Sequence, residues 1–242
     1  MEECEYYQMD AIEKDHWWFV AKRKFVGTVL DRFVKDENIK SLDVGCGTGA
    51  VMEMFIKRGY NVEGVDPSDT ALGFCKKKNL IVTKGIAGHL PYPDNSFDVV
   101  TALDVLEHVQ EDIQAVIEIY RVLKPGGIFI STVPAHQFLF SSHDKALHHF
   151  RRYSRSQFQK ILSSSTGEIL YLGWIHMAIF LPAVLLRMCV RIFGDRKSKS
   201  DVKMSNPVLN TIMDTIYVPE LTWFKKLHLP WGLSLIGVVR KK

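Results

Sequence analysis

The stretch LDVGCGTGA at residues 42–50 constrains the fold of this chain more than any other segment. An apolar run typical of a buried strand leads into three alternating glycines, Gly45, Gly47 and Gly49, and a helical pattern follows. Glycine permits a tight turn and lets a ligand approach the backbone. The stretch therefore predicts a strand, a turn that can face a ligand, and a helix.

Strand-like and helix-like segments go on alternating after this stretch. In order they read NVEGVD, SDTALGFCKKK, LIVTKGIA, FDVVTALD, DIQAVIEIYRVL, a Pro-Gly-Gly turn at residues 125–127, and GIFISTV. The alternation predicts parallel strands joined by crossover helices, covered by helices on both faces. We expect at least five strands in one doubly wound α/β sheet. The final segment, LSLIGVVRKK, reads as one more strand at the edge of the sheet.

Composition narrows the class of protein. The 242 residues, 47% of them hydrophobic, are enough for one domain with a buried core. A net charge of +4 over 31 basic and 27 acidic side chains is too balanced for a dedicated nucleic-acid binder, so we expect no nucleic-acid partner. The four cysteines are far apart, and the acidic N-terminus lacks a secretory pattern. We expect a cytoplasmic protein, either a monomer or a homodimer.

Asp66 is the first candidate binding side chain outside the glycine loop. It ends NVEGVD, seventeen residues after Gly49. A carboxylate at the end of the neighbouring strand can accept both hydroxyls of a ribose, which predicts an adenosine-containing cofactor. Gly45, Gly47 and Ala50 also satisfy the looser dinucleotide fingerprint, so these residues leave two cofactors open. A purely structural role remains open too, since glycines end strands and Asp66 before Pro67 can cap a helix.

Four blocks of sequence resemble those of the class I S-adenosylmethionine-dependent methyltransferases. They are LDVGCGTGA, VEGVD, HLPYPDNSFDVVTALDVLEHV at 89–109 and RVLKPGGIFISTVP at 121–134. The resemblance implies a Rossmann-like, mostly parallel seven-stranded sheet with helices on both faces. To this we add an N-terminal helical cap and a helical insertion before the last strand. The resemblance also implies methyl transfer from S-adenosylmethionine, with S-adenosylhomocysteine as the product.

The resemblance also assigns cofactor contacts. It implies that Asp43, Gly45 and Gly47 line the methionine portion and that Asp66 holds the ribose. The other positions that it brings to the cofactor are Cys46, Pro67, Ala87 and Asp104. Many members of the family carry an acidic residue that reaches the adenine amino group after the third strand. This chain has Ile86 there.

Methyl transfer from a sulfonium is an in-line displacement, so the main task is to hold donor and acceptor aligned and dry. A hydroxyl or amine acceptor also needs a base, and histidine is the usual choice. The candidate bases, which follow the fourth and fifth expected strands, are His108, His136, His143 and His148. His108 lies in LEHV, which recurs in this superfamily, so bracing the loop is an equal alternative for it.

The stretch HDKALHHFRRYS at 143–154 follows the fifth expected strand, where methyltransferases commonly keep substrate-binding elements. We interpret it as a lid, with a helix N-cap at Ser154. The candidate acceptor contacts in this stretch are His149, Arg151, Arg152 and Tyr153. The two arginines could clamp an anionic group or pair with the domain's own acids. A metal site would need His143, Asp144, His148 and His149 to converge. No recognised zinc spacing is present, and we expect no metal ion.

Two apolar segments complete the prediction. DHWWFVAKRKF at 15–25 resembles a segment of methyltransferases associated with surface-glycan or lipid-linked metabolism, and Trp17 and Trp18 are candidate acceptor contacts. Residues 173–193 are the most lipophilic piece, too interrupted to span a membrane. We expect residues 173–199 to contact a membrane surface, to pack in the core or a dimer, or to form a channel for a lipid-like acceptor.

The sequence thus predicts one methyltransferase domain over residues 1–242. We divide it into an N-terminal helical cap (1–35), a cofactor-binding core (36–135), a lid and substrate-side insertion (136–232) and a terminal strand (233–242). The acceptor is a small molecule, or one linked to a lipid or glycan. The alternatives are an NAD-dependent oxidoreductase and a non-catalytic protein that binds a nucleoside cofactor at a membrane surface.

Overall fold

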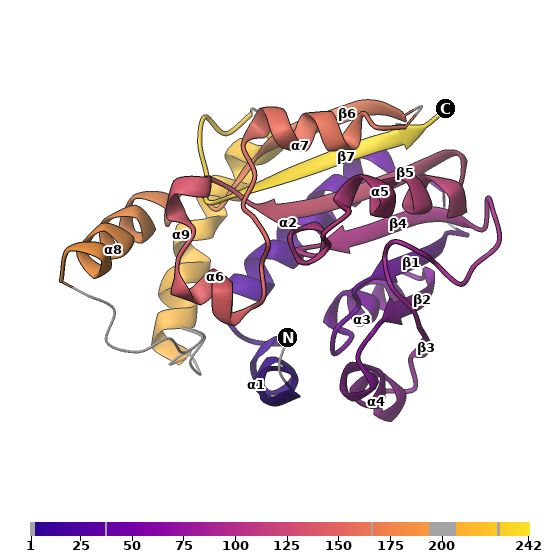
Figure 1. Ribbon diagram of the computed structural model, residues 1–242, viewed down its shortest axis with the longest axis horizontal. Helices are drawn as coiled ribbons and strands as arrows, with labels where there is room; N and C mark the ends of the chain where they lie inside the picture. The colour runs from indigo at the N-terminus through magenta and orange to yellow at the C-terminus, as the bar shows by residue number, and fades with distance from the viewer. Residues whose placement is uncertain (1–2, 37, 166, 194–206, 227) are drawn as a thin grey trace.

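The computed structural model describes residues 3–36, 38–165, 167–193, 207–226 and 228–242, with the backbone alone at residues 190–193. Its centre is a seven-stranded sheet (Figure 1). The strands are β1 (Lys40–Val44), β2 (Asn61–Asp66), β3 (Ile81–Lys84), β4 (Phe97–Leu103), β5 (Leu123–Pro134), β6 (Gly167–Ile175) and β7 (Ser234–Lys241). They lie in the order β3-β2-β1-β4-β5-β7-β6.

The sheet is parallel except around β7, which pairs antiparallel with both β5 and β6. This confirms the mostly parallel, seven-stranded prediction. The placement of the last strand was wrong, because β7 lies between β5 and β6, and β6 forms the edge. The expected turn at residues 125–127 lies within the bounds of β5, next to a register shift in its pairing with β4.

Helices cover both faces of the sheet (Figure 1). The longer ones are α1 (Glu3–Ile12), α2 (Trp17–Phe33), α3 (Ala50–Lys57), α4 (Asp69–Lys77), α5 (Asp112–Val122), α7 (Arg155–Leu162), α8 (Phe180–Phe193) and α9 (Pro207–Lys226). The short ones are η1 (Leu106–His108), η2 (Gln137–Leu139) and α6 (Ser142–Ala146). Helices α5 and α7 pack on one face, and α2, α3 and α9 pack on the other.

Two hydrophobic clusters hold these layers together. Residues 128–133 of β5 are buried at every position because helices cover both faces, which a strand with one solvated face would not show. On α5, Ala115, Val116, Ile119 and Val122 recur at helical spacing and are fully buried against the sheet. Ser154 accepts a hydrogen bond from the backbone N–H of Gln157, so it caps α7 as predicted.

The segments outside the core differ in part from expectation. Trp17 and Trp18 begin a helix of 17 residues and not a short one. The lipophilic piece at 173–193 is divided, because its first three residues belong to β6 and its helix begins only at Phe180. Within the described residues, no helix is long and apolar enough to cross a membrane. The loop expected at 194–203 and the basic residues Arg196, Lys197 and Lys199 lie outside the described part.

Candidate active site

The glycine loop lies at the carboxyl end of β1, as the sequence predicts. Gly45, Gly47 and Gly49 all have positive φ angles, of 69°, 52° and 98°. A Cβ atom on Gly45 would lie 2.5 Å from Cγ2 of Val105, which follows the end of β4. Gly45 is therefore required both by its backbone conformation and by the close approach of the neighbouring loop.

Asp66 ends β2 directly beside this loop. Its Oδ2 accepts a hydrogen bond from the backbone N–H of Gly47 at 3.0 Å, and its Oδ1 accepts one from Ser68 at 2.9 Å. Burial raises the pKa of Asp66, and these two N–H groups oppose the rise. The side chain that caps α4 is Ser68, so Asp66 is not the N-cap residue. The carboxylate is thus fixed against the glycine loop, the arrangement a ribose contact requires.

Asp43 precedes the glycine loop in β1, and Cys46 lies within the loop; both side chains are buried. Oδ1 of Asp43 accepts a hydrogen bond from the Thr101 hydroxyl at 2.6 Å, and burial raises the pKa of Asp43 to about 7. Cys46 is buried, and the neighbouring thiol of Cys75 donates to the carbonyl of Gly47 at 3.3 Å. Asp43 therefore braces β1 against β4 as well as lying next to the predicted methionine position.

Helix α1 covers the loop, a contact that the sequence did not reveal. The nearest atom to a Cβ on Gly47 would be Cε of Met9, at 3.4 Å. Tyr6 is buried nearby, and burial together with the Asp66 carboxylate raises its pKa to about 12. The only sequence signal was the placing of Tyr6 and Met9 three residues apart, on one face of an N-terminal helix.

Pro67, Ile86 and Ala87, at or beside the predicted cofactor site, follow the ends of β2 and β3. Ala87 is buried, while Pro67 is exposed in the turn between β2 and α4. Ile86, which stands where many relatives have an acid, is 58% exposed. Its side chain can offer an apolar surface to a purine ring but no hydrogen bond.

Asp104 directly follows β4, next to the proposed cofactor loop. It has a positive φ of 55°, accepts a hydrogen bond from the Thr132 hydroxyl at 2.8 Å, and forms an ion pair with Lys22 of α2. Burial alone would raise the pKa of Asp104, but Lys22 and Thr132 together lower it. Sequence reasoning missed Lys22, although it follows Trp18 by four residues and so shares its helix face.

Trp17 and Trp18, at the start of α2, face α9 and the segment before α8. The ring of Trp18 stacks on His176 with centroids 4.2 Å apart, and the ring of Trp17 stacks on Tyr217 of α9 at 6.1 Å. His176 is fully buried, and burial lowers its pKa to about 3, so the ring is neutral at pH 7. Its Nδ1 lies 2.9 Å from the Tyr217 hydroxyl. The two tryptophans thus pack against the chain itself and remain half-buried.

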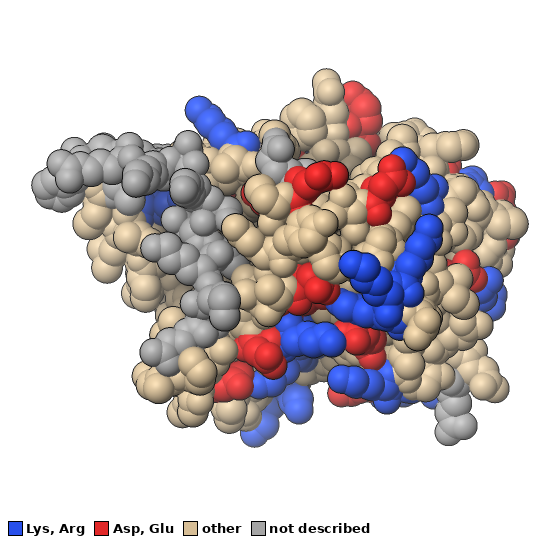
Figure 2. Space-filling view, turned by 90° about the horizontal axis from the view of Figure 1, so that it is seen from below, with Lys and Arg blue, Asp and Glu red and all other residues tan. Residues whose placement is uncertain are grey.

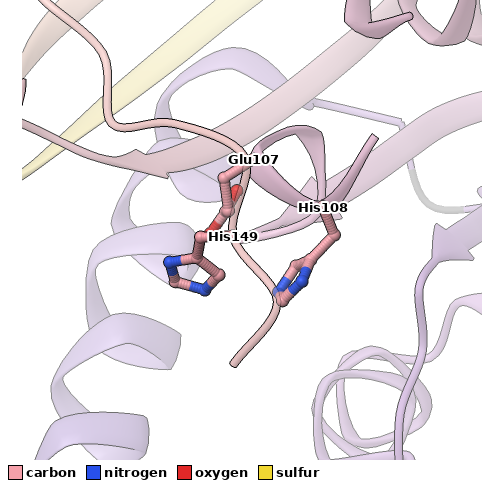
Figure 3. A group of neighbouring side chains, drawn as sticks. All are labelled: Glu107, His108 and His149. Atoms are coloured by element: carbon pink, nitrogen blue, oxygen red, sulfur yellow. The ribbon is translucent and has the colours of Figure 1, made fainter. Parts of the chain in front are cut away.

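Two of the predicted histidines meet at η1 (Figure 3). The rings of His108 and His149 are in edge contact with centroids 4.5 Å apart, and Glu107 joins them. Burial lowers the pKa of His108 to about 4, and His149 acts in the same direction. His108 is therefore neutral at pH 7. Glu107 stands beside His108 in LEHV, and sequence reasoning gave it no role.

Arg151, Arg152 and Tyr153 hold residues 143–154, the predicted lid, onto the domain. Arg151 pairs with Asp112 at 2.8 Å, and Nε of Arg152 donates to Asp144 at 2.7 Å. The Tyr153 hydroxyl, which is buried, donates to Asp112 at 2.9 Å. This is the alternative in which the arginines pair with the domain's own acids, so a clamp on the acceptor would first have to break these pairs.

The other candidate bases have different surroundings. His136 contacts the carbonyl of Gly232 through Nε2 at 2.9 Å and stacks on Trp174 with centroids 4.9 Å apart. Burial lowers its pKa. His143 lies half-buried in α6, and His148 is exposed with a φ of 58°. Of the five histidines of this region, His108 and His149 are in ring contact, and His148 lies close enough to His108 to help lower its pKa.

The surface carries both signs of charge. On the face shown in Figure 2, lysine and arginine side chains alternate with aspartate and glutamate. Among the described residues on that face there is no extended field of one sign such as a nucleic-acid phosphate backbone would require.

Comparisons with known proteins agree with this geometry. Residues 42–131, which contain the glycine loop, Asp66 and Asp104, match the family described as "Methyltransferase domain". A ubiquinone biosynthesis O-methyltransferase of Pseudomonas entomophila (strain L48) is 35% identical over 115 residues, which are 43% of this chain and 48% of that protein. The chain thus spans about half the length of the curated relatives it matches.

Solved structures extend the likeness to the whole fold. The cyclase SpnF superposes with a TM-score of 0.62 over 93% of this chain and 82% of its own, at 22% identity. Phosphoethanolamine N-methyltransferase 2 of Haemonchus contortus, solved in complex with S-adenosyl-L-methionine, gives 0.58 over 90% of this chain and 52% of its own, at 19% identity. At these identities the likeness establishes the fold alone.

Proposed function

We propose that this chain, which carries a class I S-adenosylmethionine-dependent methyltransferase domain, transfers the methyl group of S-adenosylmethionine to a small-molecule acceptor. The observation that supports this most is the pairing of the glycine loop with Asp66, whose Oδ2 lies 3.0 Å from the Gly47 nitrogen. In the proposed complex the methionine portion lies along Asp43, Gly45, Cys46 and Gly47. Asp66 accepts the ribose hydroxyls.

The reaction moves one carbon. The bond between the methyl carbon and the sulfonium sulfur breaks as the acceptor atom attacks in line, and S-adenosylhomocysteine leaves. Holding the two reactants aligned and away from water accounts for most of the acceleration. A hydroxyl or amine acceptor also loses a proton. Among the candidate bases, His108 lies next to the end of β4 and its ring is neutral, as a base requires, but a pKa lowered to about 4 makes it a weak proton acceptor.

We further propose that the acceptor is lipid-linked and approaches from α8 and α9. Four apolar side chains of α8 are more than half exposed, namely Leu181, Leu185, Leu186 and Met188. On α9, Val208 and Ile212 are also exposed. Figure 1 shows α8 projecting away from the sheet. Such helices can lie in a membrane interface or guide a lipid tail. The pathway named for the relatives, ubiquinone biosynthesis, agrees with an acceptor of this kind.

The test is transfer of a labelled methyl group from S-adenosylmethionine to a host-cell extract, followed by separation of lipid from aqueous products. We expect label in the lipid fraction with the unaltered chain and none with Asp66→Ala. The matched control is Asp69→Ala, which removes an exposed carboxylate three residues further along. The variant Leu181→Glu/Leu185→Glu should keep affinity for S-adenosylhomocysteine but lose lipid labelling.

The outcomes separate the competing functions. Label confined to aqueous products would contradict the proposal of a lipid-linked acceptor but would still support methyl transfer. Tight binding of NAD⁺ without affinity for S-adenosylhomocysteine would point to an oxidoreductase. Binding of S-adenosylhomocysteine without label in any fraction would favour a non-catalytic nucleoside-binding protein.

A further inference from the structure

Glu107, His108 and His149 form a compact cluster of metal-binding side chains. Each offers one ligand atom, and these three atoms lie within 4.8 Å of one another. Glu107 and His108 project from η1, and His149 projects from the segment after α6 toward the same space (Figure 3). Residues 41 positions apart in the chain therefore meet at the end of β4.

The carboxylate of Glu107 lacks a partner within the described residues. It is fully buried, and neither of its oxygens has a hydrogen bond among the residues that the structure describes. A buried carboxylate without a partner is strongly unfavourable. Protonation would leave its O–H equally unpaired. The nearby cations are engaged elsewhere, since Lys22 pairs with Asp104 and Arg152 pairs with Asp144.

The ring of His149, the second histidine of the cluster, is oriented by a buried carboxylate. Nδ1 of His149 lies 3.1 Å from Oδ1 of Asp144, which is completely buried. A carboxylate that holds one ring nitrogen fixes the tautomer and presents the other nitrogen as a lone-pair donor, the usual support of a metal-bound histidine. Nε2 of His149 is therefore prepared to act as a ligand.

The two segments that carry the cluster are joined to each other. The backbone N–H of Phe150 donates to the carbonyl of Glu107 at 2.8 Å, and the Tyr153 hydroxyl donates to the carbonyl of Leu106 at 3.1 Å. These bonds fix the segment of His149 against η1 at Leu106 and Glu107. A site held in this way loses little entropy when a ligand binds.

We propose that Glu107, His108 and His149 bind one divalent transition-metal ion. Two imidazole nitrogens and one carboxylate oxygen suit Zn²⁺, Fe²⁺ or Co²⁺ better than Mg²⁺ or Ca²⁺, which prefer oxygen ligands alone. Three protein ligands leave a coordination position open. This revises the sequence-based expectation of no metal. That expectation considered only the histidines and the aspartate of residues 143–149, and Glu107 and His108 supply the missing ligands.

The position gives the site a role beyond binding. Val105, directly before η1, approaches Gly45 of the cofactor loop. A metal at η1 therefore lies on the loop that adjoins the proposed methyl donor. There it would polarise an acceptor oxygen, and His108 would be a ligand and not the base.

The test uses Co²⁺ alone as the probe on the full chain after treatment with a chelator. We expect one Co²⁺ per chain, with the visible absorption of a nitrogen- and oxygen-ligated ion, and a rise in the thermal unfolding midpoint on binding. Glu107→Gln keeps the shape of the side chain but should weaken Co²⁺ binding at least about tenfold, and His149→Ala should do the same. The matched control is His89→Ala, at an exposed histidine outside the cluster.

The readouts do not involve methyl transfer, so the proposed metal site and the proposed function can fail separately. The proposal is overturned if the unaltered chain and Glu107→Gln bind Co²⁺ equally, or if His89→Ala removes the binding. It is also overturned if Co²⁺ raises the unfolding midpoint of Glu107→Gln as much as that of the unaltered chain. That last comparison also distinguishes loss of the site from loss of folding.

Discussion

Replacing Gly45 by alanine should destabilise the domain by about 2–5 kcal/mol. The φ of 69° lies in the left-handed region, which costs an alanine about 1–2 kcal/mol. The added Cβ would also lie 2.5 Å from Cγ2 of Val105, and overpacking of this kind costs about 1–3 kcal/mol. Urea unfolding measures the total loss of stability as a shift of the midpoint, provided that the dependence of the unfolding free energy on urea concentration is the same in both proteins.

Gly59 provides the matched control. Its φ of 80° imposes the same backbone strain, but nothing lies within 4 Å of the position of its Cβ. Gly59→Ala should therefore lose only about 1–2 kcal/mol. The variant Gly45→Ala/Val105→Ala should recover part of the loss of Gly45→Ala. The reasoning is refuted if Gly45→Ala is no less stable than Gly59→Ala.

Two further predictions concern buried carboxylates, and one concerns the lid. Lys22→Met should destabilise the fold by about 1.5–3 kcal/mol at pH 7. Because the pKa of Asp104 is lowered in the fold, this contribution is present above about pH 4 and is lost as the pH falls below it. The prediction is contradicted if the stabilities of the unaltered chain and of Lys22→Met fall equally as the pH is lowered. Asp43→Asn should remove a pH dependence of up to about 4 kcal/mol. Because the pKa of Asp43 is raised to about 7, the unaltered chain loses stability relative to this variant as the pH rises from about 4 to 7. If the urea midpoints of the two proteins changed with pH to the same extent, this prediction would be excluded. Tyr153→Phe should cost about 1–2 kcal/mol through its lost hydrogen bonds to Leu106 and Asp112, read from the midpoint of thermal unfolding.

The core of the fold was predictable because its signals are local. The buried strand before Gly45, the carboxylate that ends NVEGVD and the helical spacing on α5 each follow from a few neighbouring residues. The position of β7 was not predictable in this way. A C-terminal strand with one apolar pattern can pair with β5 or extend the edge, and the choice depends on α7 and β6, which pack against it.

The acceptor side was predictable only in part, since its contacts join distant segments. The cations and Tyr153 of HFRRYS looked available for a ligand, yet Asp112 and Asp144 engage them. Conversely, Lys22 and Glu107 drew no attention within their own segments and became significant only when folding placed them at the end of β4. Sequence shows which side chains are present, while the choice between an internal partner and a ligand is made by tertiary contacts.

The most direct test of the central claim is calorimetric titration of the purified chain with S-adenosylhomocysteine. The account predicts one site per chain, weakened at least about tenfold by Asp66→Ala, which removes hydrogen bonds from a charged acceptor, and unaltered by Asp69→Ala. Failure of the unaltered chain to bind S-adenosylhomocysteine, or equal binding by Asp66→Ala, would contradict it.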